Sequence, residues 1–280
     1  MLSQANILDL YYKIDRKTTK LDEDCLTILY EIKNKLGIEI INNFGVPEIK
    51  KKNNKFIKTN IDASLDKVIG SLKINLNKLS DKNYDKVSEN ILNILTSYDD
   101  NIFFKDVSAL IFSIVSKNNL NCNILSKLYC ELCDKNEYFK ELLYLELNNY
   151  CDTFKNIEYV SPNNNYDKYC EYVKLNENKI SLSLFFLECY KLDLLSLPNI
   201  ITLIENSINL LEENIEYDNN YSVCEEIVQN IYILMKGLIK SKKNSIEPII
   251  NIFIDNNFSK YKSFNNKIRF KIMDIKDLLK

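Results

Sequence analysis

The chain has 280 residues, of which 46% are hydrophobic, and its 37 basic and 39 acidic residues give a formal net charge of -2. This balance excludes a broadly cationic surface, so any contact with nucleic acid must use local lysine clusters. Only four Gly and four Pro are present, which disfavours tight β-turns and favours long helices joined by short polar loops. We therefore expect an all-α fold.

The N-terminal part of the chain differs from the rest. Residues 1–46 are expected to form a separate helical extension, with helices at 3–14 and 22–36 whose apolar residues recur at helical spacing. Residues 47–62 contain a proline and five lysines and are expected to form an extended, basic linker. The remaining segment, 63–280, is predicted to be one helical domain.

Apolar residues recur at helical spacing throughout this domain, most clearly in 101–117. From Ser181 to Leu195 the chain is apolar on nearly every side, which indicates a helix at the centre of the fold. The predicted helices are 63–79, 81–96, 101–117, 121–135, 137–155, 165–191, 197–213, 222–240, 246–258 and 265–279.

Local start signals support several of these helices. The segment Ser196–Pro198 supplies an N-cap and a first-turn proline, and the segment Ser245–Pro248 repeats this device. Ser222 with Glu225 is typical of a capping box. Because each signal follows soon after the preceding helix, consecutive helices are expected to be antiparallel neighbours joined by short turns, such as the turn in 76–87.

Paired helices of this kind predict about five antiparallel hairpins of about forty residues each. That period is typical of HEAT repeats, so we expect a HEAT-like, right-handed solenoid. Two four-helix bundles would also give antiparallel pairs, and periodicity does not distinguish these architectures.

Cysteine and histidine usage bears on catalysis and metal binding. The chain has eight cysteines and no histidine, and reduced thiols in the core are the expected state. The alternative is a zinc site in which the Cys130–Cys133 pair recruits Cys122 or Cys151.

Without a histidine base, a Gly-rich phosphate loop or a paired-carboxylate motif, the chain is predicted not to be an enzyme and to need no cofactor. No apolar run approaches the ~18 to 20 residues of a membrane span, so a cytoplasmic protein without a membrane partner is expected.

Four blocks of the sequence, in order, resemble the MIF4G domain, the middle domain of the translation initiation scaffold eIF4G. The blocks are INLNKLSDKNY (74–84), ALIFSIVSKNNLNCNILSKLYCELCDK (109–135), ISLSLFFLECYKLDLLSLPNIITLIENSI (180–208) and NNKIRFKIMDIKDLLK (265–280). The last block is the most specific, because it places Arg269, Phe270 and two acids in a fixed order. The chain departs from the family at Asp81, where a proline is usual, and at Asn178-Lys179, where Gly-Asn is usual.

The resemblance implies a translation-initiation scaffold that binds and activates a DEAD-box RNA helicase of the eIF4A type. The alternatives are a MIF4G adaptor acting in RNA splicing or decay, and a generic HEAT-like interaction scaffold without a helicase partner. Helicase-binding positions implied by the resemblance are Asn54, Phe56, Ile57, Leu76, Leu79, Tyr84, Arg269, Phe270, Asp274 and Asp277.

Each of these positions also has a structural interpretation. Phe56 replaces a family tryptophan and either docks on the helicase or folds back onto the first helix. Leu76, Leu79 and Tyr84 lie at helical spacing beside a turn, which favours a place in the core. The guanidinium of Arg269 suits a bidentate carboxylate, with an internal ion pair slightly favoured over a helicase carboxylate.

Two lysine clusters are candidates for weak RNA binding directed at phosphates, and the alternative for each is a solvated polar face. They comprise Lys50, Lys51, Lys52, Lys55 and Lys58 in the linker, and Lys236, Lys240, Lys242 and Lys243 near a helix end. The closest matches to the Tyr-x4-Leu motif for cap-binding proteins, at 138–143 and 190–195, lie inside predicted helices. We assign no such site there, although residues 1–46 remain a candidate contact for a cap-binding protein through another motif.

Overall fold

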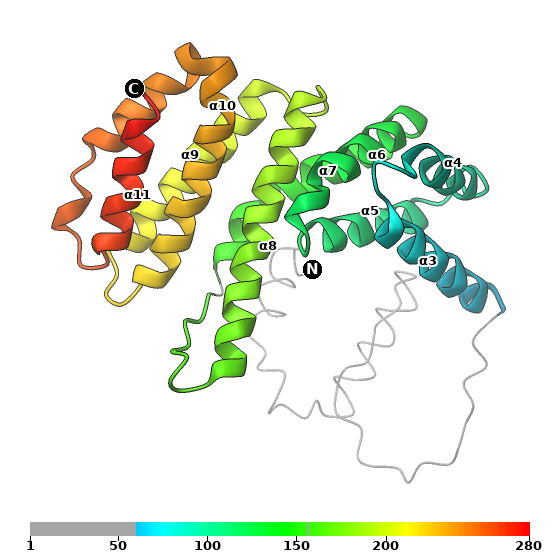
Figure 1. Ribbon diagram of the computed structural model, residues 1–280, viewed down its shortest axis with the longest axis horizontal. Coiled ribbons are helices and arrows are strands. Elements are labelled where there is room, and N and C mark those ends of the chain that lie inside the picture. Colours follow the sequence, from blue (N-terminus) through cyan, green and yellow to red (C-terminus); the bar gives the residue numbers. More distant parts are fainter. Residues whose placement is uncertain (1–59, 156) are drawn as a thin grey trace, which may run out of the picture. The chain divides into compact units, whose positions relative to one another are not determined.

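The computed structural model describes residues 60–155 and 157–280, which belong to the second of the two units into which the chain divides, Lys58–Lys280. Within these ranges every regular element is an α-helix or a short 3-10 helix, and no strand occurs (Figure 1). The all-α prediction is confirmed for this part. The predicted N-terminal extension at 1–46, with its suggested cap-binding partner, lies outside the described residues, as does the predicted linker up to residue 59.

The described helices correspond to the predicted ones with small differences at their ends. In chain order they are α3 (Asn60–Lys78), α4 (Tyr84–Leu95), α5 (Asn101–Val115), η1 (Asn119–Asn121), α6 (Cys122–Lys135), α7 (Tyr138–Asn149), η2 (Tyr150–Phe154), α8 (Tyr166–Lys191), α9 (Leu197–Ile215), α10 (Tyr221–Asp255), η3 (Phe258–Lys260) and α11 (Asn266–Asp277).

The main difference concerns α10, which joins two predicted helices. Only Lys242, with φ -135° and ψ 39°, departs from helical geometry between them. The predicted helices 222–240 and 246–258 are therefore two helical segments separated by a kink at Lys242, and the predicted N-cap Ser245 lies three residues beyond that kink, inside the second segment. Pro248 has no amide hydrogen to bond the carbonyl of Asn244, yet the helix continues past it. The chain changes direction at one residue instead of at a turn.

Two predicted caps have opposite outcomes. At α9 the capping box is present, with Asn199 N donating to Ser196 Oγ (3.4 Å) and Ser196 N donating to Asn199 Oδ1 (2.8 Å). At α10 the predicted box is wrong, because the N-cap is Asn220 and its side chain makes no capping bond. Ser222 is buried instead, and Glu225 contacts residues at the start of α11.

The turn between α3 and α4 is held by one side chain. Asn83 Oδ1 accepts hydrogen bonds from the amide of Ser80 (2.8 Å) and from its hydroxyl (2.9 Å), and Asn83 Nδ2 donates to the carbonyl of Lys78 (2.8 Å). These bonds satisfy backbone groups that the end of α3 leaves free. The predicted short turn within 76–87 is confirmed.

The helices pack mainly on helices close to them in the chain. α3 contacts α4 and α5, α5 contacts α7 and α8, and α6 contacts α8. α10 contacts α8, α9 and α11. The core is therefore built from successive contacts between neighbouring helices, with α8 packing on helices both before and after it in the sequence (Figure 1).

An aromatic cluster fills the core where α5, α6, α7 and α8 meet. The ring of Tyr129 lies 5.4 Å from that of Phe112 and 6.0 Å from those of Phe139 and Phe185. Its hydroxyl donates to the carbonyl of Phe139 (2.9 Å) and lies 2.7 Å from Ser108 Oγ. This pairing satisfies the one polar group of a fully buried side chain, and burial raises the pKa of Tyr129.

The segment predicted to be the centre of the fold is buried on several sides. In α8, Leu182, Phe185, Phe186, Leu187 and Cys189 are all buried. α8 approaches α10 closely, because a Cβ atom at Gly237 would clash with both methyl groups of Leu187. Glycine at this position allows the two helices to approach each other.

Candidate functional site

The first-hairpin residues implied to bind a helicase lie largely inside the fold. Leu76 and Leu79 are buried, as their helical spacing indicated. Tyr84 is half-buried; its hydroxyl donates to Glu131 Oε1 (2.8 Å), and the ammonium of Lys127 lies 5.2 Å from its ring. Burial and the neighbouring Glu131 raise the pKa of Tyr84. Of the three, only Tyr84 retains a surface that a partner could reach.

Eight other predicted residues cannot be placed. Asn54, Phe56 and Ile57 of the implied helicase contact, and Lys50, Lys51, Lys52, Lys55 and Lys58 of the first lysine cluster, lie outside the described residues. Their predicted roles stay predictions. The predicted residues that the structure brings together are those of α10 and α11.

The start of α11 is fixed against α10. Asn265 caps the helix, with its Oδ1 accepting from the amide of Ile268 (3.1 Å), and its Nδ2 donates to Glu225 Oε1 (2.6 Å). The ammonium of Lys267 pairs with Glu225 Oε2 (3.0 Å), which raises the pKa of that lysine. Ile268 and Ile275 are buried on the inner side of the helix. These contacts determine which residues of α11 face outward.

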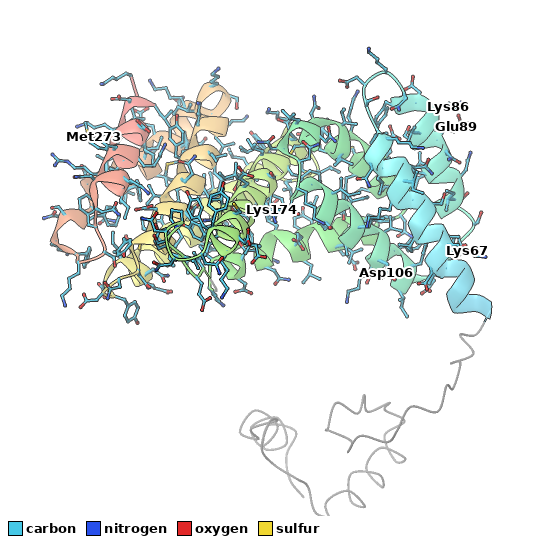
Figure 2. All side chains as sticks on the ribbon, turned by 60° about the horizontal axis from the view of Figure 1, so that its bottom comes forward. Lys67, Lys86, Glu89, Asp106, Lys174 and Met273 are labelled. Carbon is cyan, nitrogen blue, oxygen red and sulfur yellow. The ribbon has the colours of Figure 1, made fainter. Side chains whose placement is uncertain are left out.

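The outer side of α11 carries two exposed apolar side chains one turn apart. Phe270 is 61% exposed and Met273 is 52% exposed. Arg269, next to Phe270, is also exposed and forms no ion pair with a described residue, so the internal ion pair favoured for it is absent from this part of the chain. Met273 lies on the same helix and was not predicted, although its spacing of three residues from Phe270 was a usable signal (Figure 2).

The two predicted acids of this helix are engaged locally. Asp274 pairs with Lys271 (3.0 Å), and Asp277 pairs with Lys280 (2.6 Å). Each pair lies within one short stretch of chain and has a carboxylate that is more than half exposed (51% and 60%), so both contribute little to stability. A partner carrying cations could still compete for these carboxylates.

The second lysine cluster is only partly free. The ammonium of Lys236 lies 5.4 Å from the ring of Tyr232, and that of Lys271 lies 4.5 Å from the same ring. Lys243 Nζ donates to the carbonyl of Leu279 (3.1 Å) at the end of α11, where a cation is favourable. Lys240 and Lys242 are exposed. Tyr232 and Lys271, which join α10 and α11 here, were not predicted.

We define the α11 surface as Arg269, Phe270 and Met273, all exposed on the last helix. It combines an apolar pair with one cation. Such a combination suits a protein partner that offers an apolar recess with acidic groups around it.

The cysteines give no support to a metal site in the described part of the chain. Cys130 and Cys133 are half-buried free thiols, and no group of three or more metal-ligating side chains occurs among the described residues. Cys122 is buried and donates to the carbonyl of Ser181 (3.3 Å), and burial raises its pKa to about 12. Such a thiol is a core residue and not a reactive one.

Comparison with known proteins adds no family. No protein-family model matches the chain, and no curated protein matches it. Among the described helices, none has the length and apolar character needed to span a bilayer.

Proposed function

We propose that this chain is an eIF4G-like scaffold with a MIF4G-type, HEAT-like domain, which binds a DEAD-box RNA helicase of the eIF4A type and stimulates it. In this proposal the scaffold does no chemistry itself. It also contacts RNA weakly through lysines, without reading bases.

The packing pattern supports the HEAT-like part of the proposal. In a helical solenoid each hairpin contacts chiefly the hairpins next to it in the chain. The contacts of α3 with α4 and α5, of α6 with α8, and of α10 with α8, α9 and α11 follow this order.

The observation that carries the helicase proposal is the exposure of Phe270 beside an unpaired Arg269. A phenylalanine that is 61% exposed gains free energy when a partner covers it. Arg269 has no ion-pair partner in the described part of the chain, so its guanidinium is available for a bidentate carboxylate. Aromatic and arginine side chains are those that most often dominate interface energies.

Stimulation would follow from a difference in contact energy. A scaffold that contacts the two lobes of a helicase better in one arrangement shifts the population toward that arrangement. A difference of about 1.4 kcal/mol changes the population ratio tenfold. No reacting group on the scaffold is needed.

The RNA part of the proposal rests on Lys236 and Lys240, which are exposed on α10, and Lys236 shares the ring of Tyr232 with the cationic Lys271. Lysine contacts with phosphates are independent of sequence and weaken as salt rises. We therefore expect binding of unrelated RNA sequences with similar affinity, and a steep loss of that binding with added salt.

An RNA-dependent ATPase assay with an eIF4A-type helicase tests the proposal. The full chain is expected to raise ATP turnover, and the double variant Arg269→Ala, Phe270→Ala is expected to lose this effect. Removing interface residues of this kind costs about 2 kcal/mol or more of binding free energy, a loss of about 30-fold in affinity. Both side chains are exposed, so the fold should be unaffected.

The matched control is Leu120→Ala, which removes an apolar side chain that is 85% exposed on η1. This variant should stimulate the helicase as the unmodified chain does. Unchanged turnover with the unmodified chain would refute the helicase proposal and leave a generic interaction scaffold. Stimulation of a splicing or decay helicase in place of the eIF4A type would favour the adaptor alternative.

A further inference from the structure

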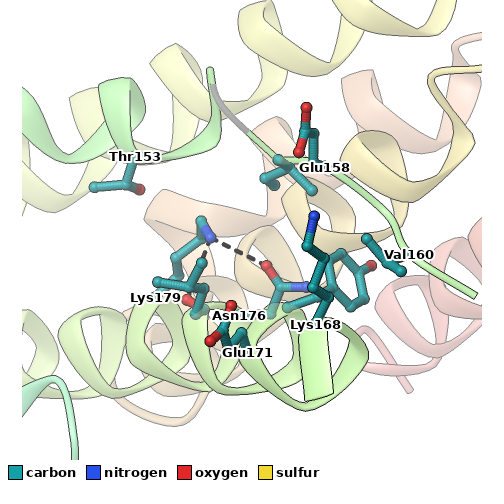
Figure 3. A pocket seen from close by; sticks show the side chains of 10 residues that line it. Thr153, Glu158, Val160, Lys168, Glu171, Asn176 and Lys179 are labelled. Atoms are coloured by element: carbon teal, nitrogen blue, oxygen red, sulfur yellow. Dashed lines mark hydrogen bonds between the residues drawn. The ribbon is translucent and has the colours of Figure 1, made fainter. Parts of the chain in front are cut away.

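A cavity of about 390 Å³ lies between the first half of α8 and the segment that follows η2. Its lining includes Thr153, Glu158, Lys168, Tyr172, Asn176 and Lys179. Figure 3 shows Lys179 and Asn176 rising from α8 and pointing toward one another, with Glu158 on the opposite wall. A cavity of this size is large enough for a small organic molecule.

The wall formed by α8 contains a buried cation. Lys179 is 6% exposed, and its ammonium donates to the carbonyl of Leu175 (3.2 Å) and to Asn176 Oδ1 (3.0 Å). An ammonium carries three hydrogens, so one remains after these two bonds, with the centre of the Phe154 ring 5.7 Å from the nitrogen. Lys179 forms no ion pair with a described residue; burial lowers its pKa, and the carboxylate of Glu226, beyond ion-pair distance, opposes this shift. A buried cation that no anion contacts directly is stabilised when one joins it.

The neighbouring amide is also incomplete. Asn176 is 5% exposed, and its Nδ2 has no hydrogen-bond partner among the described residues. The orientation of the amide is fixed, because its oxygen accepts from Lys179. The hydroxyl of Tyr172 donates to Glu226 Oε1 (3.4 Å), and its oxygen neighbours Asn176 without closing a hydrogen bond to Nδ2. Asn176 therefore presents unused donors beside the unused donor of Lys179.

The remaining lining selects the kind of anion. Glu158 and Glu171 carry negative charge at the cavity, which disfavours a doubly charged phosphate. Ile157, Val160 and Leu175 supply apolar wall. A single negative charge attached to a hydrocarbon body matches both features.

We propose that this cavity binds a small monocarboxylic acid, with the ammonium of Lys179 and the Nδ2 group of Asn176 donating to the carboxylate and the apolar wall holding the hydrocarbon part. The site is independent of the α11 surface, so its failure would leave the helicase proposal intact. The natural ligand is expected to be a small monocarboxylic acid, and hexanoate serves as the probe.

Calorimetric titration of the full chain with hexanoate, and with hexanamide as the uncharged control, tests the proposal. Hexanoate is expected to bind and hexanamide is not. The variants Lys179→Met and Asn176→Leu should each weaken hexanoate binding by about tenfold or more. Lys174→Met, which removes an exposed lysine from the same helix, should leave binding unchanged.

A second measurement does not depend on how the variants fold. In the unmodified chain, the side-chain amide resonances of Asn176 should shift as hexanoate saturates the site, because Nδ2 gains an acceptor. Absence of hexanoate binding up to its solubility limit would overturn the proposal. Equal binding of hexanoate and hexanamide, unchanged binding in a folded Lys179→Met variant, or binding without a shift at Asn176 would do the same.

Discussion

Asn265 and Glu225 join the last helix to the one before it. Asn265 Nδ2 donates to Glu225 Oε1 (2.6 Å), while Asn265 Oδ1 caps α11 by accepting from the amide of Ile268 (3.1 Å). One side chain therefore both starts α11 and ties it to α10. Lys267 adds an ion pair to the same carboxylate (3.0 Å). The orientation of the α11 surface depends on this contact.

Removal of the Glu225 carboxylate should loosen α11. Glu225→Ala is expected to lower the free energy of unfolding by about 1 to 3 kcal/mol, because a hydrogen bond to a charged group is lost. Lys267→Ala removes only the partner that is 80% exposed, so it should cost about 0.5 kcal/mol or less. Urea unfolding of both variants measures these losses in unfolding free energy. Hydrogen exchange of the backbone amides in α11 should also become faster in Glu225→Ala. Equal costs for the two variants would contradict the assignment.

The buried hydroxyl of Tyr150 should stabilise the contact between η2, α8 and α10. It donates to Asn230 Oδ1 (2.9 Å) and lies 2.6 Å from Ser183 Oγ. Tyr150→Phe is expected to cost about 1 to 3 kcal/mol, since it leaves buried polar atoms with fewer partners. The double variant with Ser183→Ala should cost less than the sum of the single variants, because the residues share one network. Tyr217→Phe, at a side chain that is 66% exposed, is the control and should have no measurable effect.

Substitution at Leu76 should act through stability and not through a direct contact with a partner. Leu76 is 1% exposed, so Leu76→Ala is expected to cost about 2 to 5 kcal/mol of unfolding free energy. Ile74→Ala, on the same helix but 56% exposed, should cost much less. Thermal unfolding measures the stability of the Leu76→Ala and Ile74→Ala variants. If Leu76→Ala kept full stability yet lost helicase binding, Leu76 would be a contact residue after all.

Glu146 should make stability depend on pH. Burial raises the pKa of its carboxyl, so the folded state holds the proton more tightly than the unfolded state does. Its contribution to stability is fully present below the unfolded pKa and is lost as pH rises through the higher folded pKa. The stability of the unmodified chain relative to Glu146→Gln should therefore fall between acidic and neutral pH. Urea unfolding across this pH range measures the difference, and a difference that grew with pH would have the wrong sign.

Local patterns in the sequence predicted much of the described fold. The apolar stripe of 101–117 gave α5 and its buried face, because a period of 3.6 residues records which side of a helix leaves water. The cap at Ser196 was predictable for a similar reason, since its donors and acceptors lie within three residues. The turn held by Asn83 followed from two adjacent helical patterns.

By itself the sequence determined the helices, their apolar faces and the short turns between them, because each depends on residues close together in the chain. Tertiary structure alone decided that Glu225 anchors α11 instead of capping α10, that Arg269 is exposed, and that Lys179 and Asn176 share a cavity wall. These outcomes depend on which distant segments pack together. Burial and pairing are properties of that packing, and helical periodicity does not encode them.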